Sequence, residues 1–263
     1  MKPLDFKTKK TFELAQFHIK NKGIVQELIQ SIPLHKSDLV IEIGPGLGVI
    51  TQTMAPLIKE LIAIELDKTR ENDLAIALKP HTNCQVYWMD FLKFTLPKSP
   101  YKIVSNIPFN LTRKILQKII TSENLPDLVC LILQTEVSDK ICRQEGEHTT
   151  LSAHIQTFYK CKPIKTFQRD DFSPPAHVNT VAILMELKPD APIINKALYF
   201  NFIETSFENP GQPLKTRLKK HFTFKQIKRI GSDLKINLEL PPHTLTTKNW
   251  LNLFNLHHQL NKT

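Results

Sequence analysis

The 263-residue sequence is poor in glycine and cysteine and has no long hydrophobic run. Three of its seven glycines, Gly44, Gly46 and Gly48, fall within five residues. The four cysteines form no CxxC pair, which excludes a zinc ribbon and is typical of reduced thiols in the cytoplasm. The best apolar run, residues 128–133, is far shorter than the roughly 18 residues of a membrane span, and no apolar segment follows the basic first residues. We therefore expect a cytoplasmic protein with no membrane segment, no secretory signal and no metal.

Basic residues outnumber acidic ones by 35 to 25, and the excess lies at the two ends of the chain. Residues 1–22 carry a net charge of +4, residues 23–187 a net charge of −1, and residues 188–263 a net charge of +7. Between Lys215 and Arg229 there are seven basic residues and no acidic one. Such ends attract a polyanion such as RNA or DNA, but a solvated helix face gives the same pattern. The charge alone leaves both interpretations open.

Short apolar runs alternate with helical patterns over the first two thirds of the sequence. Strands are expected at residues 39–43, 61–66, 85–89, 101–105 and 128–133, with two more at 155–168 and 180–187. Helical spacing is expected at residues 23–32, 49–57 and 111–121, after Asp67, and after the fifth strand. Strands that are apolar at nearly every position and alternate with helices indicate a parallel sheet covered on both faces. The last two strands are expected to form an antiparallel edge.

A polar segment at residues 188–192 (Lys-Pro-Asp-Ala-Pro) is typical of a linker. Beyond it the apolar spacing is helical, over residues 197–207, 214–221, 224–234 and 245–260. We therefore predict two domains. The first is an α/β domain of residues 1–187 with a basic arm at 1–22, and the second is a small helical domain of residues 188–263.

The turn Glu42–Gly48 follows the first expected strand and opens a helix. Glycines there let the backbone turn tightly and approach a ligand. The spacing is GxGxG, and Val49 stands where a dinucleotide-binding motif has its third glycine, which disfavours NAD. Acidic residues end the next two expected strands, with Glu65 and Asp67 after the second and Asp90 after the third. This acidic rim without a Walker lysine favours a cationic nucleoside such as S-adenosylmethionine, although Asp67 taken alone fits a helix N-cap.

The segment Ser105–Phe109 reads Ser-Asn-Ile-Pro-Phe and follows the fourth expected strand. An exocyclic adenine amine is a poor nucleophile because its lone pair is delocalised into the ring. The side-chain oxygen of Asn106 and the backbone carbonyl of Ile107 can accept both amine hydrogens, and Phe109 can stack on an extruded base. The alternative is an ordinary turn from strand to helix with a core phenylalanine.

Together these motifs resemble the ribosomal RNA adenine N(6)-dimethyltransferase family over nearly the whole chain. The residues that carry the likeness are Glu42–Gly48, Ile64–Asp67, Met89-Asp90-Phe91, Ser105–Phe109 and Asp171–Val178. The resemblance implies a Rossmann-like, S-adenosyl-L-methionine-dependent methyltransferase sheet followed by a small all-helical, RNA-binding domain. The NIPF form of the turn and the short tail are closer to the Erm group. Erm enzymes methylate one adenine of 23S rRNA and so confer resistance to macrolide, lincosamide and streptogramin B antibiotics.

The resemblance also implies which residues form the site. It implies contacts with S-adenosyl-L-methionine for Gln16, His18, Gly44, Gly46, Glu65, Leu66, Asp90, Phe91 and Asn106. It implies catalytic contacts with the target adenine for Asn106, Ile107, Phe109 and Phe172. The basic residues expected to bind RNA are Lys7, Lys9, Lys10, Lys215, Arg217, Lys219 and Lys220.

Some positions depart from the family pattern. The family's amino-terminal signature reads Ala15-Gln16-Phe17-His18 here, so Gln16 either aligns with the family glutamine or replaces its asparagine. Phe109 stands where tyrosine is commoner, and Ala176 stands where the family has a proline. Gly48 is an additional small residue of no obvious cost.

The partner implied is 23S rRNA, before full ribosome assembly, and we expect the protein to act as a monomer. A KsgA-like enzyme that dimethylates adenine in 16S rRNA during ribosome biogenesis remains an alternative. A ribosome-assembly factor that binds rRNA without catalysis is a second alternative, although Glu65, Asp90 and Asn106 argue against it.

Overall fold

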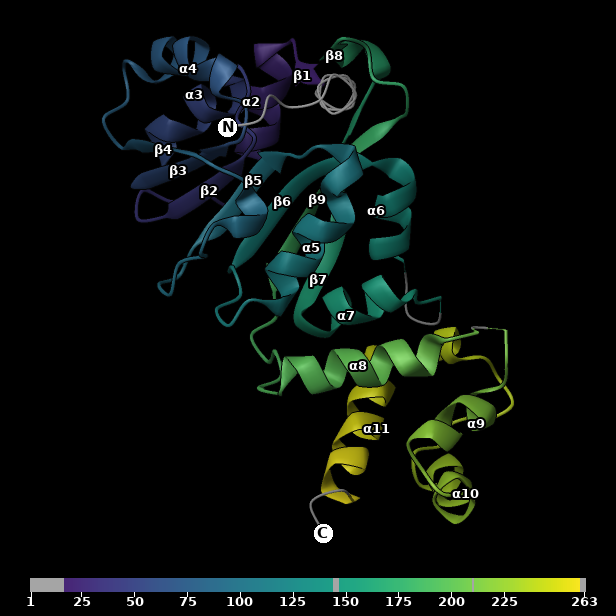
Figure 1. Cartoon of the computed structure of the whole chain (residues 1–263). Coiled ribbons are helices and arrows are strands. Elements are labelled where there is room, and N and C mark those ends of the chain that lie inside the picture. Colours follow the sequence, from purple (N-terminus) through teal and green to yellow (C-terminus); the bar gives the residue numbers. More distant parts are fainter. Residues whose placement is uncertain (1–16, 144–146, 210, 261–263) are drawn as a thin grey trace, which may run out of the picture. The chain divides into compact units, whose positions relative to one another are not determined.

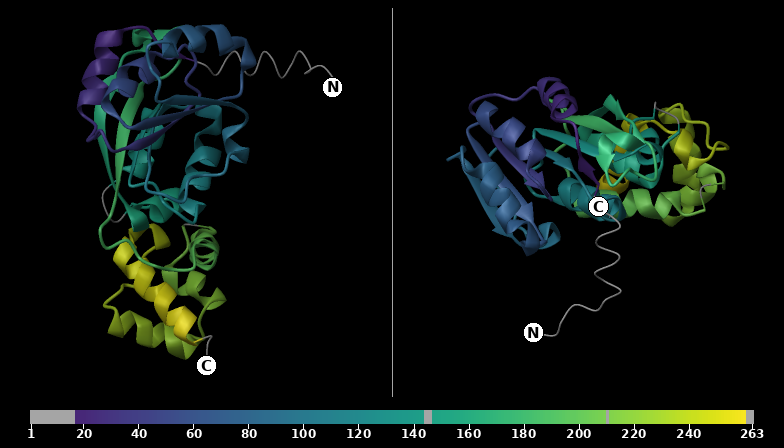
Figure 2. Two further views of the ribbon diagram at one scale, coloured as in Figure 1. Left: turned by 90° about the vertical axis from the view of Figure 1, so that its left-hand side faces the viewer. Right: turned by 90° about the horizontal axis from the view of Figure 1, so that it is seen from above.

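A computed structural model describes residues 17–143, 147–209 and 211–260 (Figures 1 and 2). The chain forms two compact units: residues up to 138 with 162–186, and residues 139–161 with 187 onwards. This division differs from the expected boundary at residue 187, because residues 139–161 group with the carboxy-terminal helices. Among the described residues, no helix is long and apolar enough to cross a membrane.

The first unit is built on a seven-stranded sheet with the order β4-β3-β2-β5-β6-β9-β7. The strands are β2 (Leu39–Ile43), β3 (Glu60–Glu65), β4 (Cys84–Trp88), β5 (Lys102–Asn106), β6 (Leu128–Gln134), β7 (Tyr159–Phe167) and β9 (Thr180–Leu187). Strands β2 to β6 pair in parallel, and β9 runs antiparallel to β6. The Rossmann-like α/β fold predicted from the sequence is thereby confirmed, with the first five strands within one residue of the expected bounds.

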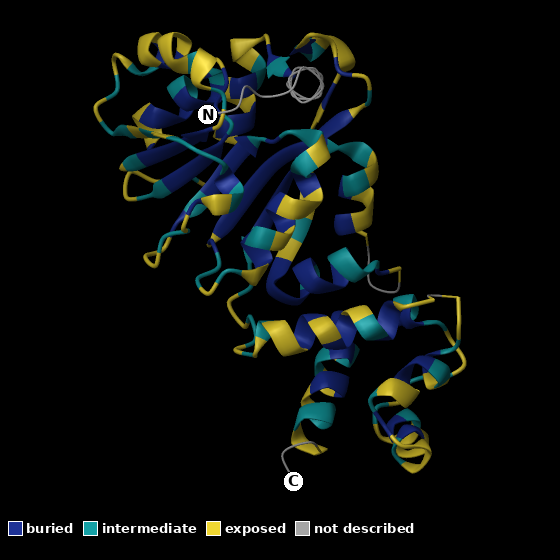
Figure 3. Cartoon of the chain, viewed as in Figure 1, coloured by how far each residue is buried: buried dark blue, intermediate teal, exposed yellow. Residues whose placement is uncertain are grey.

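Helices cover both faces of this sheet, as Figure 1 shows. They are α2 (Lys22–Gln30), α3 (Val49–Met54), α4 (Glu71–Leu78), α5 (Thr112–Thr121) and α6 (Thr135–Ile141). Short 3-10 helices complete the connections: η1 (Ala55–Leu57), η2 (Lys68–Arg70), η3 (Phe91–Lys93), η4 (Phe109–Leu111) and η5 (Arg169–Asp171). Neighbouring residues of a strand point to opposite faces, and both Val40 and Ile41 of β2 are fully buried. The apolar runs of the sequence therefore reflect burial of the sheet from both sides (Figure 3).

The strand order reverses between β2 and β5, because the chain builds β3 and β4 on one side of β2 and β5 and β6 on the other. In an open α/β sheet the carboxyl ends of the strands at such a reversal form a crevice for a ligand. The glycine turn follows β2, and the NIPF turn follows β5. Both motifs therefore lie at this reversal.

A separate two-stranded sheet ties the beginning of the described chain to a distant segment. Strand β1 (His18–Ile19) pairs antiparallel with β8 (Phe172–Ser173), with His18 opposite Ser173. The pairing brings Phe17 to the same end of the main sheet as the two turns.

Residues 155–168 are not one strand, contrary to the sequence-based expectation. Helix α7 (Thr150–Phe158) occupies the first part, and β7 begins only at Tyr159. The side chains of Thr149 and Ser152 form a capping box at the start of α7. Ile155 and Phe158 fit helical spacing as well as a strand, and the cap decides in favour of the helix.

The described residues of the second unit beyond Leu187 contain helices and no strand, as expected. It contains α7 together with α8 (Lys196–Phe207), α9 (Leu214–Arg217), η6 (Leu218–Lys220), α10 (Phe224–Asp233), η7 (Pro242–Thr244) and α11 (Thr247–Leu260). Its core is aromatic, with buried Tyr199, Phe200, Phe202, Phe207, Phe222, Trp250 and Phe254. Helix α7 joins this core because Thr157 hydrogen-bonds to the Tyr199 hydroxyl (2.8 Å) and the rings of His154 and Phe200 lie 4.3 Å apart.

Candidate active site

The turn after β2 depends on backbone conformations that favour glycine. Gly44 and Gly46 have φ angles of 65° and 56°, in the left-handed region that L side chains rarely adopt. A Cβ atom on Gly46 would lie 2.7 Å from a ring carbon of His18, which leaves no room for a side chain. The amide of Gly46 donates a hydrogen bond to the carboxylate of Glu65 (3.1 Å). The turn thus presents bare backbone between the ends of β2 and β3.

Gly48 has a structural role that the sequence did not reveal. Its φ angle is 76°, and a Cβ atom there would lie 2.7 Å from the Cβ of Ala77 in α4. Gly48 therefore lets α3 begin directly against α4.

Two buried carboxyl groups lie beneath the glycine turn. Glu65 is 3% exposed, and its carboxylate also accepts a hydrogen bond from the amide of Asp67 (2.8 Å). Burial raises the pKa of Glu65, and the hydrogen bonds from the backbone oppose that rise. Glu42 is 1% exposed and accepts a hydrogen bond from the Thr51 hydroxyl (2.7 Å). Burial raises the pKa of Glu42 to about 8, so this carboxyl group is mostly protonated at neutral pH.

Two further acidic side chains cap short helices at this end of the sheet. Asp67 accepts a hydrogen bond from the amide of Thr69 (3.0 Å) and starts η2, which confirms its expected alternative role as an N-cap. Asp90 accepts from the amide of Leu92 (2.8 Å) and starts η3. Asp90 also lines the cavity described below, whereas Asp67 does not.

The NIPF turn is attached to the amino-terminal segment through Asn106. The side-chain nitrogen of Asn106 donates a hydrogen bond to the carbonyl oxygen of Phe17 (2.6 Å). The rings of Phe17 and Phe109 lie 5.5 Å apart. Since the nitrogen is engaged in this bond, the amide oxygen of Asn106 is the end left to accept hydrogen bonds, and no described residue donates to it.

Most of the residues expected at the site line one cavity at the strand-order reversal. They are His18, Gly44, Gly46, Glu65, Leu66, Asp90, Phe91, Asn106, Ile107 and Phe109. Sequence reasoning missed other lining residues: Phe17, Ile43, Ile64, Met89, Leu92, Pro108, Leu111 and Ile115. Phe17 belongs to the signature segment, and Ile43, Ile64, Met89 and Pro108 stand within the quoted motifs, so these five were detectable. Leu92, Leu111 and Ile115 had no signal that separates them from core residues.

Phe172 does not belong to this cavity. Its side chain is fully buried, and its ring packs against Phe167 at a centroid distance of 5.7 Å. A ring with no exposed surface offers no face to a base, which corrects the expectation that Phe172 stacks on the target adenine.

Gln16, Lys7, Lys9 and Lys10 lie outside the described residues. Among those that are described, no group of His, Cys, Asp and Glu could hold a metal ion.

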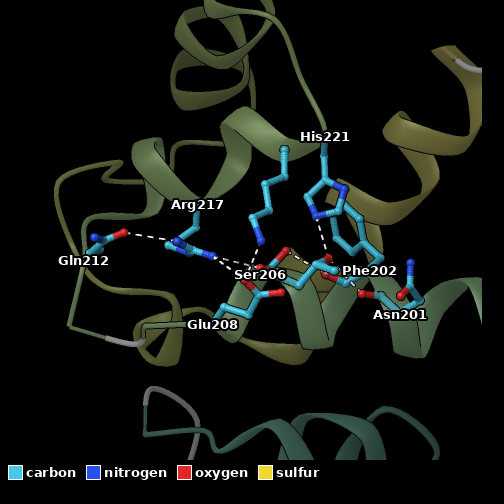
Figure 4. A network of polar contacts seen from close by, with 9 residues as sticks. Asn201, Phe202, Ser206, Glu208, Gln212, Arg217 and His221 are labelled. Carbon is cyan, nitrogen blue, oxygen red and sulfur yellow. Dashed lines mark hydrogen bonds and ion pairs between the residues drawn. The ribbon is translucent and has the colours of Figure 1, made fainter.

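Arg217 does not present its charge to solvent. Its side chain is 7% exposed, and its guanidinium donates to Gln212 (3.0 Å) and to the carbonyl oxygen of Thr205 (3.2 Å), close to Glu208 (Figure 4). The group therefore holds α8 to α9, which corrects its expected role in RNA binding. Lys220 pairs with the same Glu208.

The other two basic residues expected at this surface are exposed. Lys215 pairs with Glu239 (2.7 Å), while Lys219 forms no ion pair with a described residue. The predicted basic cluster is thus partly neutralised by acids that lie outside residues 215–229 in the sequence.

The first unit has a Rossmann-like α/β fold, and comparison with solved structures agrees. A dimethyladenosine transferase from Plasmodium falciparum matches with a TM-score of 0.81 and 22% identity, over 92% of this chain and 98% of that one. The 23S rRNA methyltransferase ErmE matches with a TM-score of 0.77 and 19% identity, over 92% and 100%. At this identity the likeness concerns the fold.

Sequence comparison identifies the family. The family model described as ribosomal RNA adenine dimethylase matches residues 7–259, so the chain belongs to that family, as its motifs predicted. An rRNA adenine N-6-methyltransferase of Bacteroides fragilis is 30% identical over 255 residues, covering 94% of each chain. A ribosomal RNA small subunit methyltransferase A of Nostoc sp. is 26% identical over 259 residues, covering 92% of this chain and 96% of the relative. The protein is accordingly an enzyme, an rRNA adenine N6-methyltransferase.

Proposed function

We propose that the protein transfers methyl groups from S-adenosyl-L-methionine to the exocyclic amine of one adenine in 23S rRNA. The observation that carries the proposal is the shared cavity. There the NIPF turn, with Asn106 and Phe109, faces the glycine turn and the acidic residues Glu65 and Asp90. We also propose that the enzyme acts as a monomer before the ribosome is fully assembled, that the second unit contributes to RNA binding, and that the modification confers macrolide, lincosamide and streptogramin B resistance.

The residues of the cavity fit S-adenosyl-L-methionine. The backbone at Gly44 can lie against its methionine end, because a Cβ added there would meet no heavy atom within 4 Å, and Gly46 lines the same cavity. Each carboxylate oxygen of Glu65 accepts one backbone hydrogen bond and retains a lone pair for a ribose hydroxyl. Leu66 and Phe91 supply apolar surface for the adenine ring, and Asp90 supplies an acceptor for its amine. When bound, this cofactor supplies an electrophilic methyl group on a positively charged sulfur.

The chain's own contribution to the chemistry is the placement of the target amine. The amide oxygen of Asn106 and the carbonyl oxygen of Ile107 accept the two amine hydrogens, which directs the nitrogen lone pair towards the methyl group. Phe109 stacks on the extruded base. Holding the two reacting atoms in line supplies much of the reduction in the barrier. His18 is not needed as a base, and burial lowers its pKa, so it is neutral at pH 7.

A small-subunit target is the second candidate, because several relatives carry that name at similar identity. They include the Nostoc protein and a small subunit methyltransferase A of Mycoplasma mobile that is 29% identical over 235 residues. Support for the 23S target comes from the NIPF form of the turn and the short helical tail.

Mapping the methylated nucleotide tests the proposal. Primer extension and mass spectrometry on rRNA from cells that express the protein should find modification at one adenine of 23S rRNA. The same cells should grow at higher erythromycin concentrations than cells that express the Asn106→Ala variant. Modification confined to 16S rRNA would establish the second candidate, and unmodified rRNA would contradict both.

A further inference from the structure

Helix α10 begins with a capping box, and the residues around this cap are either buried in the core or exposed to solvent. The side chains of Thr223 and Gln226 form a capping box with the backbone. Phe222 before the cap and Ile227 after it are both buried, as in a hydrophobic staple, and Ile230 continues the buried side. The core contacts of α10 are thereby provided without Phe224.

Phe224, the first residue of α10, points into solvent. Its side chain is 80% exposed, which makes it the most exposed aromatic residue of the described chain. A single exposed apolar residue is ordinary, so its neighbours decide whether it matters. Lys228 lies one turn further along the same face, because residues three and four apart are neighbours on a helix. Lys225 follows Phe224 in the chain and is a neighbour of Lys228 by the same rule. Both lysines are exposed.

The charge of these two lysines is not neutralised within the described chain. Three other basic residues nearby form ion pairs with acidic side chains. Lys215 pairs with Glu239, Lys220 with Glu208, and Arg229 with Asp233 at 3.1 Å. Lys225 and Lys228 form no ion pair with a described residue. The exposed ring is therefore flanked by the uncompensated positive charge of α10.

We propose that this face of α10 binds an unpaired segment of the RNA substrate, with Phe224 stacked on a base and Lys225 and Lys228 against the adjacent phosphates. The inference rests on the proposed function, because it assumes an RNA substrate. Aromatic rings within a positively charged surface are the usual means of holding single-stranded nucleic acid without reading its sequence. A duplex keeps its bases stacked inside, so it can use the lysines but not the ring.

Fluorescence anisotropy with the full chain and labelled oligouridylate, in the absence of cofactor, tests the proposal. This RNA is unpaired and contains no adenine, so the active site has no target in it. Phe224→Ala should weaken binding roughly tenfold, and Phe224→Trp should restore it. Ile76→Ala is the matched control, because Ile76 is an equally solvated residue of α4 (75% exposed) and its removal should change nothing.

The lysines are tested through salt. Replacing Lys225 and Lys228 together by Gln should lower the slope of log affinity against log salt by about 1.4, since each phosphate contact with a single strand contributes about 0.7. Lys59→Gln with Lys79→Gln removes the same charge from exposed positions of the first unit and should leave the slope unchanged.

Three results would overturn the inference. Phe224→Ala binding oligouridylate like the wild type would remove the ring from the contact, and equal weakening towards a blunt RNA duplex would exclude stacking. Phe224-dependent binding to phosphatidylserine vesicles with unchanged RNA binding would identify a membrane contact instead. Methyl transfer to rRNA by the wild type is measured separately, so the inference and the proposed function can fail independently.

Discussion

The side-chain amide of Asn106 is oriented by a backbone group far away in sequence. The carbonyl oxygen of Phe17 accepts a hydrogen bond from its nitrogen at 2.6 Å, so the oxygen is the free end. A side chain restrained in this way loses little conformational freedom when the adenine amine arrives. Orientation before binding is what makes a polar group effective in a transition state.

Replacing Asn106 by Ala should lower kcat by about a thousandfold, the upper range for removal of one oriented polar group. The dissociation constant for S-adenosyl-L-methionine should stay within a few fold, because the glycine backbone and the carboxylates make most of the proposed cofactor contacts. Single-turnover methylation and calorimetric binding separate the two effects. Asn110→Ala changes an exposed asparagine of the same turn and should leave both constants unaltered. Unchanged turnover in Asn106→Ala would exclude this side chain from the chemistry.

Individual site residues were predictable from sequence where their role depends on local backbone. Gly44, Gly46 and Asn106 follow strands directly, and the parallel sheet brings strand ends together. Phe172 and Arg217 were not predictable, because the sequence does not say which way a ring or a guanidinium turns. Phe172 faces Phe167, and Arg217 finds acceptors on α8, contacts that depend on how distant segments pack.

At the scale of elements, the contact between α3 and α4 depends on the residue that begins α3. Gly48→Ala should lower the free energy of unfolding by about 2 kcal/mol, because the left-handed backbone disfavours alanine and the new methyl group would meet Ala77. Urea denaturation measures the change. Gly211→Ala is the control: no heavy atom lies within 4 Å of its added Cβ, so its unfolding midpoint should not fall. Equal midpoints for the two variants would show that the helices adjust without cost.

The elements themselves were largely predictable, with one instructive exception. Strands β2, β3, β5 and β6 are largely buried on both faces, so nearly unbroken apolar runs marked them, whereas residues of the edge strand β4 are half-buried or exposed. Helix α7 was mistaken for the start of a strand because Ile155 and Phe158 fit either period. The signal that distinguishes them is Thr149 followed three residues later by Ser152, a cap that an apolar pattern does not contain.

At the scale of the whole molecule, the net charge of +10 overstates the positive surface. Within the second unit Arg217 is enclosed, and two lysines, Lys215 and Lys220, are paired with Glu239 and Glu208. A count of basic residues therefore cannot identify an RNA surface, whereas the positions of the unpaired cations can. This difference gives a prediction about Arg217.

Arg217→Met should destabilise the protein by about 2 kcal/mol, because buried hydrogen bonds to Gln212 and Thr205 are lost. The salt slope of RNA binding should not change, since the charge is not exposed. Lys219→Met changes an exposed residue, so its unfolding midpoint should change little. A reduced salt slope of RNA binding for Arg217→Met, with unaltered stability, would show that the guanidinium contacts RNA.

The pairing of β1 with β8 also imposes an order of events on the growing chain. Phe17 precedes β1, and β1 has β8 as its strand partner in the described chain, with His18 opposite Ser173. Because synthesis proceeds from the amino end, strands β2 to β6 all emerge before β8 exists. A nascent chain halted after β6 and before β8 would contain the glycine turn and the NIPF turn. Without β8 as the strand partner of β1, Phe17 would not yet be held next to Asn106. The cavity at this end of the sheet is thus completed late in synthesis, after the parallel strands have been made.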